Sequence, residues 1–193
     1  MGIEVSKDIR KLFNLDKQII FATAQSLTAV AKEAQTSVIA EIEQTFTTRG
    51  KWYLPGNKYG VKIKAARKDD LSAEVKTAAD WLVLHETGGT KTPQGHSLAV
   101  PTENVRRTKR QIITRGQRPR NLKRAFVINT QSGPVLFQRK NKRSIVALYN
   151  LEPRVPIKRE STVVAPTEKV VQARFDKIFV EKLANAVRTA KMD

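Results

Sequence analysis

Residues 125–150 read AFVINTQSGPVLFQRKNKRSIVALYN. Within this stretch, β-branched and aromatic side chains gather in three short runs, at 125–129, 135–139 and 144–150, and such residues favour strands. The turn-forming residues Gln131–Pro134 separate the first two runs, and a basic turn at Lys140–Arg143 precedes the third. This spacing predicts a β-hairpin continued by a third antiparallel strand, within residues 125–151.

Shorter apolar runs before this stretch predict the first strands, within residues 58–103. Apolar residues alternate with lysines over Tyr59–Ala65, which is typical of a half-solvated strand. A second run with a period of two covers residues 73–85 and ends at the turn signal Gly88-Gly89, and a third short run lies at 97–100. We therefore expect a small antiparallel sheet made of short strands.

Long helices are expected on both sides of these strands. Within residues 1–50, apolar residues recur at spacings of three, four and seven, with no Pro or Gly from Ile3 to Arg49. This pattern predicts a long amphipathic helix that packs on the core. Because about forty residues is long for a globular helix, a break at Thr23–Ser26 is the alternative. A second apolar stripe predicts a helix over residues 166–191.

The connection between the third strand of the hairpin region and the last helix contains Pro153 and Pro156. Prolines remove backbone donors, so we expect an extended, unpaired crossing over residues 152–165. Helices that are segregated from an antiparallel sheet indicate an α+β fold. We expect a single domain over residues 1–193, with both helices packed across one face of the small sheet and with a long basic arm or loop.

The composition excludes several classes of protein. The chain has 36 Lys and Arg residues against 18 Asp and Glu residues, a formal net charge of +18. It has no cysteine, which excludes disulfides, iron–sulfur clusters and thiolate zinc sites. Its apolar runs are far shorter than the roughly 20 residues of a membrane helix. We expect a soluble, unprocessed, intracellular polypeptide with an anionic partner and no membrane partner.

Positive charge is concentrated in residues 104–151, which hold 13 basic residues and no acidic one. Residues 104–124 contain few aliphatic anchors, so we expect an extended, mobile arm or loop that becomes ordered on a partner. Its cations are the candidate contacts for a nucleic acid or an acidic protein: Arg106, Arg107, Lys109, Arg110, Arg115, Arg118, Arg120, Lys123 and Arg124. A solubilising charged loop is the alternative. Residues 106–124 contain no aromatic residue, which argues against a stacking platform for single strands.

The sequence offers no complete catalytic or metal site. Its two histidines are eleven residues apart, with no further ligand at a metal spacing. Glu86 beside His85 is the sole candidate pairing, and we interpret it as a strand-end hydrogen bond or a subunit contact. Gly88–Lys91 lacks the spacing of a phosphate-binding loop, and Asp69-Asp70 is interpreted as a turn. We expect no catalytic residue, no metal and no cofactor, and therefore a protein that is not an enzyme.

A set of charged, hydrophobic, glycine and proline positions marks the second half of the chain: Arg124-Ala125-Phe126, Gly133, Phe137-Gln138-Arg139, Arg143, Ile145, Pro153, Pro156, Phe175, Phe179 and Leu183. Residues 122–187, which contain this set, resemble the minor tail protein Z-like tail-completion proteins of tailed bacteriophages. The turn His85–Gly88 is similar to a strand ending in the wider group of phage neck and tail-completion proteins.

The resemblance implies a structural virion protein that completes the tail and joins it to the head around the DNA channel. It implies a ring of roughly six or twelve copies, beside neighbouring neck and tail proteins and assembled in the host cytoplasm. The positions expected at subunit interfaces are His85, Glu86, Arg139, Arg143, Pro153 and Pro156. The resemblance does not extend to residues 1–50, so a neck adaptor or a tail terminator is an alternative slot. A non-enzymatic nucleic-acid-binding module is the alternative outside this family.

Overall fold

The computed structural model of this protein describes residues 2–189, and the chain divides into two compact units. Unit 1 comprises the residues up to Phe46, Gly50–Asp80 and the residues from Ser161 onward. Unit 2 comprises Thr47–Arg49 and Trp81–Glu160. The chain therefore forms two packed bodies where a single domain over residues 1–193 was expected.

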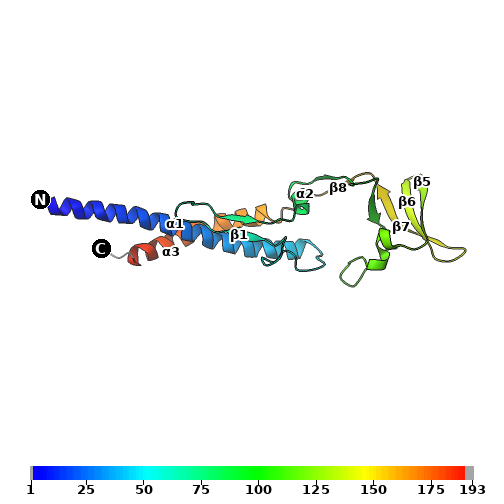
Figure 1. The fold of residues 1–193 in the computed structure, drawn as a ribbon, viewed down its shortest axis with the longest axis horizontal. Helices are drawn as coiled ribbons and strands as arrows, with labels where there is room; N and C mark the ends of the chain where they lie inside the picture. Colours follow the sequence, from blue (N-terminus) through cyan, green and yellow to red (C-terminus); the bar gives the residue numbers. More distant parts are fainter. Residues whose placement is uncertain (1, 190–193) are drawn as a thin grey trace. The chain divides into compact units, whose positions relative to one another are not determined.

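Two antiparallel helices dominate unit 1: α1, Gly2–Thr45, and α3, Val164–Thr189 (Figure 1). α1 is continuous, so the break considered at Thr23–Ser26 does not occur. The hydroxyls of Thr23 and Ser26 donate to carbonyls four residues earlier, at 2.8 Å and 2.7 Å. These bonds satisfy the polar side chains inside a helix, so the sequence of small polar residues does not interrupt it.

α3 begins two residues before the expected start at Pro166. Proline is tolerated there because the first N–H groups of a helix have no intrahelical partner. Residues 190 and 191 of the expected helix lie outside the described residues. Across the helix pair, the Arg174 Nε and Nη2 atoms donate to the two carboxylate oxygens of Glu33, at 2.8 Å and 3.1 Å. This ion pair joins α3 to α1 beside their apolar contact.

The core of unit 1 lies along the helix pair. α1 contributes fully buried Ala22, Ala34, Val38 and Ile42, and α3 contributes Ile178 and Ala186 to the buried set. Small side chains on α1 allow a close approach of its neighbours, and the aliphatic residues fill the remaining space. The apolar stripes predicted for both helices are therefore used in core packing.

A two-stranded ribbon, β1 (Lys62–Lys64) with β2 (Glu74–Lys76), packs on α1. β1 is shorter than the alternating pattern over Tyr59–Ala65 predicts, because the residues on either side of it bond to α1. The Val61 carbonyl accepts from the Gln35 side chain at 2.7 Å, and the Ala66 N–H donates to the Thr28 hydroxyl at 3.1 Å.

The strand predicted over residues 73–85 is wrong beyond β2. Residues Trp81–Thr87 form a short helix, α2, which places His85 and Glu86 on a helix and not at the end of a strand. Asp80 precedes the helix, where aspartate is favoured, and Gly88 follows it with φ 70°, which is typical of a glycine that ends a helix. These local signals outweigh the period of two.

Unit 2 contains a four-stranded antiparallel sheet in the order β4-β7-β6-β5 (Figure 1). Its strands are β4 (Leu98–Pro101), β5 (Ala125–Thr130), β6 (Gly133–Arg139) and β7 (Ile145–Glu152). The predicted hairpin and third strand within residues 125–151 are confirmed. β7 lies between β4 and β6, so β4 and β5 form the two edges of this sheet.

A second ribbon in unit 2 corrects the expectation of an unpaired crossing over residues 152–165. β8 (Val155–Ile157) pairs antiparallel with β3 (Gly89–Lys91), and Pro156 lies opposite Thr90. Each strand of a two-stranded ribbon is an edge strand, where proline is tolerated. The segment therefore pairs despite its prolines.

The fold class is α+β, as predicted, with a long N-terminal helix, a C-terminal helix and small antiparallel sheets. The packing within that class differs from the expectation. α1 packs against α3 and the β1–β2 ribbon, while the four-stranded sheet belongs to unit 2 and covers its own apolar cluster.

Candidate polyanion-binding surface

The basic segment 104–124 is a folded loop in unit 2. Val105 is 3% exposed and forms an apolar cluster with Leu148 and Tyr149 of β7, against which Ile113 and Leu122 of the loop also pack. Of the expected arm or loop, the structure shows a packed loop, because these side chains hold the segment on the sheet at its start, middle and end.

Hydrogen bonds reinforce this anchoring. The Tyr149 hydroxyl donates to the Gln117 carbonyl at 2.6 Å, inside a short 3-10 turn at Arg115–Gln117. A second 3-10 turn follows at Pro119–Asn121, and the Asn121 side chain donates to the Arg115 carbonyl at 2.7 Å. Burial raises the pKa of the Tyr149 hydroxyl, and the charge of Arg107 partly opposes this shift. Tyr149 therefore stays protonated and remains a donor to the loop.

Two residues of this segment other than glycine adopt left-handed backbone conformations, Gln111 with φ 59° and Arg124 with φ 54°. Gln111 lies in the turn closed by the Arg107–Ile113 bridge, where its N–H donates to the Thr108 carbonyl at 2.9 Å. Conformations of this kind cost energy and persist where the surroundings fix them. The loop is thus held in a defined path at Gln111, inside its basic run, and at Arg124, where the run ends.

The end of the loop lies beside β6, next to the basic turn between β6 and β7. The Arg139 N–H donates to the Arg124 carbonyl at 3.2 Å, and the Gln138 side chain donates to the Lys123 carbonyl at 3.1 Å. The Asn141 side chain accepts from the Ser144 N–H at 2.8 Å and closes the turn. Two basic segments separated in the sequence therefore lie side by side.

We name the resulting surface the basic face. All of its side chains are exposed: Arg106, Arg107, Lys109, Arg110, Arg115, Arg118, Arg120, Lys123, Arg124, Arg139, Lys140, Lys142 and Arg143. None of them forms an ion pair with a carboxylate among residues 15–189, whose side chains the structure describes. The Arg139 guanidinium lies over the Phe126 ring, 5.4 Å from its centroid.

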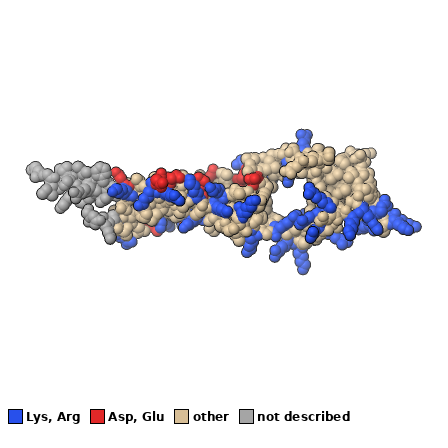
Figure 2. All heavy atoms as spheres, viewed as in Figure 1, with Lys and Arg blue, Asp and Glu red and all other residues tan. Residues whose placement is uncertain are grey.

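The charge of the protein is divided unequally between the units. Unit 2 has 18 basic and 4 acidic residues, so it carries +14 of the net charge of +18. Figure 2 shows Lys and Arg atoms gathered on one side of unit 2. Because like charges on one small body repel, unit 2 carries the larger part of the protein's electrostatic self-repulsion.

The other expected interface residues are placed in two ways. Arg139 and Arg143 belong to the basic face. His85 and Glu86 lie in the last turn of α2, where the His85 carbonyl accepts from the Glu160 N–H at 2.7 Å and the Glu86 carbonyl accepts from Arg159 Nε at 3.0 Å. These bonds tie the end of α2 to the segment that follows β8.

Pro153 and Pro156 are both exposed, the first after β7 and the second on β8. β8 pairs with β3, which follows α2 directly, so Pro156 shares the α2–β3–β8 region with His85 and Glu86. This region is separate in sequence from the loop and turn that form the basic face.

The acidic pair Asp69-Asp70 forms a turn, as interpreted from the sequence. The Asp70 carboxylate accepts from Ser72 Oγ at 2.6 Å and from Lys64 Nζ at 3.0 Å, and these contacts lower its pKa. Among the side chains that the structure describes, those of residues 15–189, there is no group of three or more His, Asp or Glu placed to hold a metal ion. Nor is any helix in this range long and apolar enough to span a membrane.

Comparisons with protein-family models, curated proteins and solved structures found no match to this chain.

Proposed function

We propose that this chain is a non-enzymatic structural protein whose basic face binds the phosphate backbone of double-stranded DNA. One observation carries the proposal: 13 exposed cations of a single folded loop and turn, none paired with a carboxylate in the part of the chain that the structure describes. Cations left unpaired on a defined surface are available to neutralise phosphates, which supplies sequence-independent affinity.

The types of residue on this surface favour phosphate. Seven of the nine cations in residues 106–124 are arginines, and the planar guanidinium bonds to phosphate oxygens through two parallel N–H groups. That segment has no aromatic residue, so it lacks the stacking surfaces that single-stranded binders use. Duplex DNA, with its regular backbone charge, is therefore the preferred partner.

The resemblance to tail-completion proteins supplies the proposed setting. In that setting the chain is a virion protein of the phage neck or tail, and it completes the tail and joins it to the head around the DNA channel. Copies of the chain form a ring beside neighbouring neck and tail proteins. The unpaired edges of β4 and β5 support self-association, because a free strand edge can add a further strand.

The test is duplex DNA binding measured against salt concentration. If about six to nine cations contact phosphates, the slope of log K against log salt is about −5 to −8. Replacing Arg118 and Arg120 with glutamine should reduce the magnitude of this slope by about 2. Lys62→Gln with Lys169→Gln, two exposed lysines of unit 1, removes the same charge and should leave the slope unchanged. A slope near zero would instead make an acidic protein surface the partner.

Ring formation has a separate test. Because of its net charge, the purified chain is expected to sediment as a monomer at moderate salt. A ring is expected when a neck or tail component provides the template and an anionic surface. A stable dimer that partners do not alter would contradict both the ring and the templating.

A further inference from the structure

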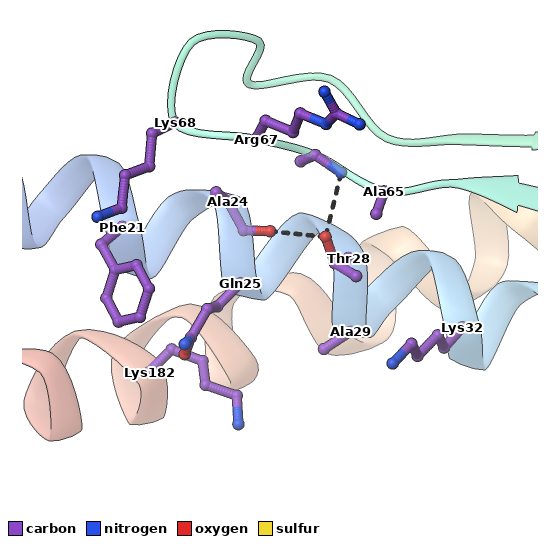
Figure 3. Close-up of a pocket in the computed structure, with 11 residues that line it drawn as sticks. Phe21, Ala24, Gln25, Thr28, Ala29, Lys32, Ala65, Arg67, Lys68 and Lys182 are labelled. Atoms are coloured by element: carbon purple, nitrogen blue, oxygen red, sulfur yellow. Dashed lines mark hydrogen bonds between the residues drawn. The ribbon is translucent and has the colours of Figure 1, made fainter.

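A groove in unit 1 lies outside the basic face, and of its lining residues only Lys182 belongs to the stretch that resembles tail-completion proteins. It has a volume of about 530 Å³ and opens between α1, the segment after β1 and α3 (Figure 3). Its floor is apolar, with Phe21, Ala24 and Ala29 from α1 and Ala65 from the segment after β1. A groove of this size is within the range of ligand sites in proteins.

Four cations line this groove and no acidic residue does. They come from three elements: Lys32 from α1, Arg67 and Lys68 from the segment after β1, and Lys182 from α3. Figure 3 shows that their charged ends do not converge on one point but are spread around the groove. A single phosphate could not reach all four, whereas a ligand with several separated negative charges could.

One wall of the groove is fixed before any ligand binds. The Thr28 hydroxyl accepts from the Ala66 N–H at 3.1 Å and donates to the Ala24 carbonyl at 2.9 Å, so it ties the segment after β1 to α1. The Lys68 ammonium lies 4.9 Å from the centroid of the Phe21 ring, a distance typical of a cation–π contact. A preformed site loses less entropy on binding than a flexible one.

From this arrangement we infer that the groove binds an acidic peptide segment of a partner protein, with aliphatic side chains between its carboxylates. The spread cations match carboxylates along an extended or helical peptide, and the apolar floor matches the aliphatic side chains. The floor suits a nucleic acid less well, because it offers one aromatic ring and no run of stacking surfaces. This inference does not depend on DNA binding by unit 2.

Gln25 provides the variant for the test. It is exposed and lines the middle of the groove on α1, so Gln25→Glu places a negative charge among the cations and Gln25→Trp fills the space without changing the charge. Gln172 is exposed on α3 and does not line the groove. Gln172→Glu and Gln172→Trp are therefore matched controls, with the same net charge and a similar helical position.

The probe is a fluorescent peptide of about twelve alternating Glu and Leu residues, and its affinity is measured by anisotropy with the full chain at low salt. Gln25→Glu should weaken binding about threefold to tenfold relative to Gln172→Glu, and Gln25→Trp should weaken it relative to Gln172→Trp. The same peptide with Gln in place of Glu should bind poorly to the wild type. Far-UV circular dichroism checks that each variant is folded.

Two outcomes would overturn the inference. Equal peptide affinity for the Gln25 and Gln172 variants would mean that the peptide binds elsewhere, for example on the basic face. If the Gln25 variants weaken duplex DNA binding as strongly as peptide binding, the groove is part of a nucleic-acid path. The wall has its own test: Thr28→Val should weaken peptide binding and Thr28→Ser, which keeps the hydroxyl, should restore it.

Discussion

The Glu33–Arg174 pair joins the two long helices of unit 1 at a position that solvent still reaches. The side chains of Glu33 and Arg174 are 40% and 43% exposed. The hydrogen bond from Arg174 is the main cause that lowers the pKa of Glu33, and partial burial opposes it. Water screens an exposed pair, so its contribution to stability is modest, but the sign of its pH dependence is defined.

A carboxylate with a lowered pKa in the folded state stabilises the fold above its ordinary pKa, and this stabilisation is lost as the pH falls through the lowered value. The ordinary pKa of Glu33 is 4.5. The wild type should therefore be more stable than Glu33→Gln near pH 7, and this advantage should shrink at about pH 3. Urea unfolding at the two pH values measures it. Glu168→Gln, at an exposed position of α3, is the control, and a difference that does not change with pH would contradict the prediction.

Tyr149 holds the basic loop through one hydrogen bond in a buried position. Tyr149→Phe leaves the Gln117 carbonyl without its partner, which should reduce the free energy of unfolding by about 1 to 2 kcal/mol. Trypsin should then cleave faster within residues 115–120 than it does in the wild type. The turn at Lys140–Lys142, which Asn141 closes independently, is the internal control, and equal acceleration at both places would argue against a local role.

At the scale of elements, the connection between α1 and β1 depends on close approach at Gly60. A Cβ atom at Gly60 would overlap the carbonyl of Leu54, in a segment closed by the bond from the Val61 N–H to the Tyr53 carbonyl at 2.8 Å. Gly60→Ala should cost about 1 to 3 kcal/mol of stability. Gly56 lies in the same connection with open space around it, so Gly56→Ala should change stability by no more than about 0.5 kcal/mol. Thermal unfolding of the two variants compares them.

The elements that the sequence predicts well are those with local causes. The hairpin of β5 and β6 is coded by a turn between two apolar runs, and α1 and α3 are coded by long periodic stripes. α2 is only seven residues long. The alternation of apolar and polar residues over 73–85 therefore led to a strand prediction there, although Asp80 and Gly88 mark the ends of the helix. The β3–β8 pairing joins residues far apart in sequence, and no local pattern predicts it.

For the basic face, the sequence predicted which residues carry the charge but not the path of the loop that presents them. Every cation named from residues 106–124 is exposed. This exposure was predictable, because the segment has no acidic side chain to pair with the cations and no aromatic ring to cover them. The path of the loop depends on Val105 meeting Leu148 and Tyr149, a contact across some forty residues that has no signature in the loop itself. The turn between β6 and β7 joins the surface through the bonds of Gln138 and Arg139 to Lys123 and Arg124, which likewise have no signature in the sequence.

At the scale of the whole molecule, the two units are expected to unfold in separate transitions. Gly60→Ala should lower the midpoint of one transition and Tyr149→Phe the midpoint of the other, as measured by differential scanning calorimetry. Raising salt from about 50 to about 300 mM should stabilise the Tyr149-sensitive transition more, because unit 2 carries most of the net charge and salt screens its self-repulsion. A single transition lowered by both variants would show that the units unfold together.

The division into units could not be read from the sequence because unit 1 is discontinuous. Each of its two helices carries an apolar stripe that could cover the sheet. The packed structure, in which Arg174 of α3 also bonds to Glu33 of α1, shows that the two helices bury each other. Segments that precede Trp81 in the sequence must pack against the segment that follows Glu160 to complete unit 1. Pairing at such separation is set by the packed structure as a whole.

This discontinuity also sets an order of events during synthesis. The ribosome adds 118 residues between the end of α1 at Thr45 and the start of α3 at Val164, which takes about 6 to 24 s at ordinary rates of translation. Over that time the nascent α1 has no α3 to cover its apolar stripe. Unit 2, most of which is one consecutive stretch, is therefore complete before unit 1, although most of unit 1 leaves the ribosome first.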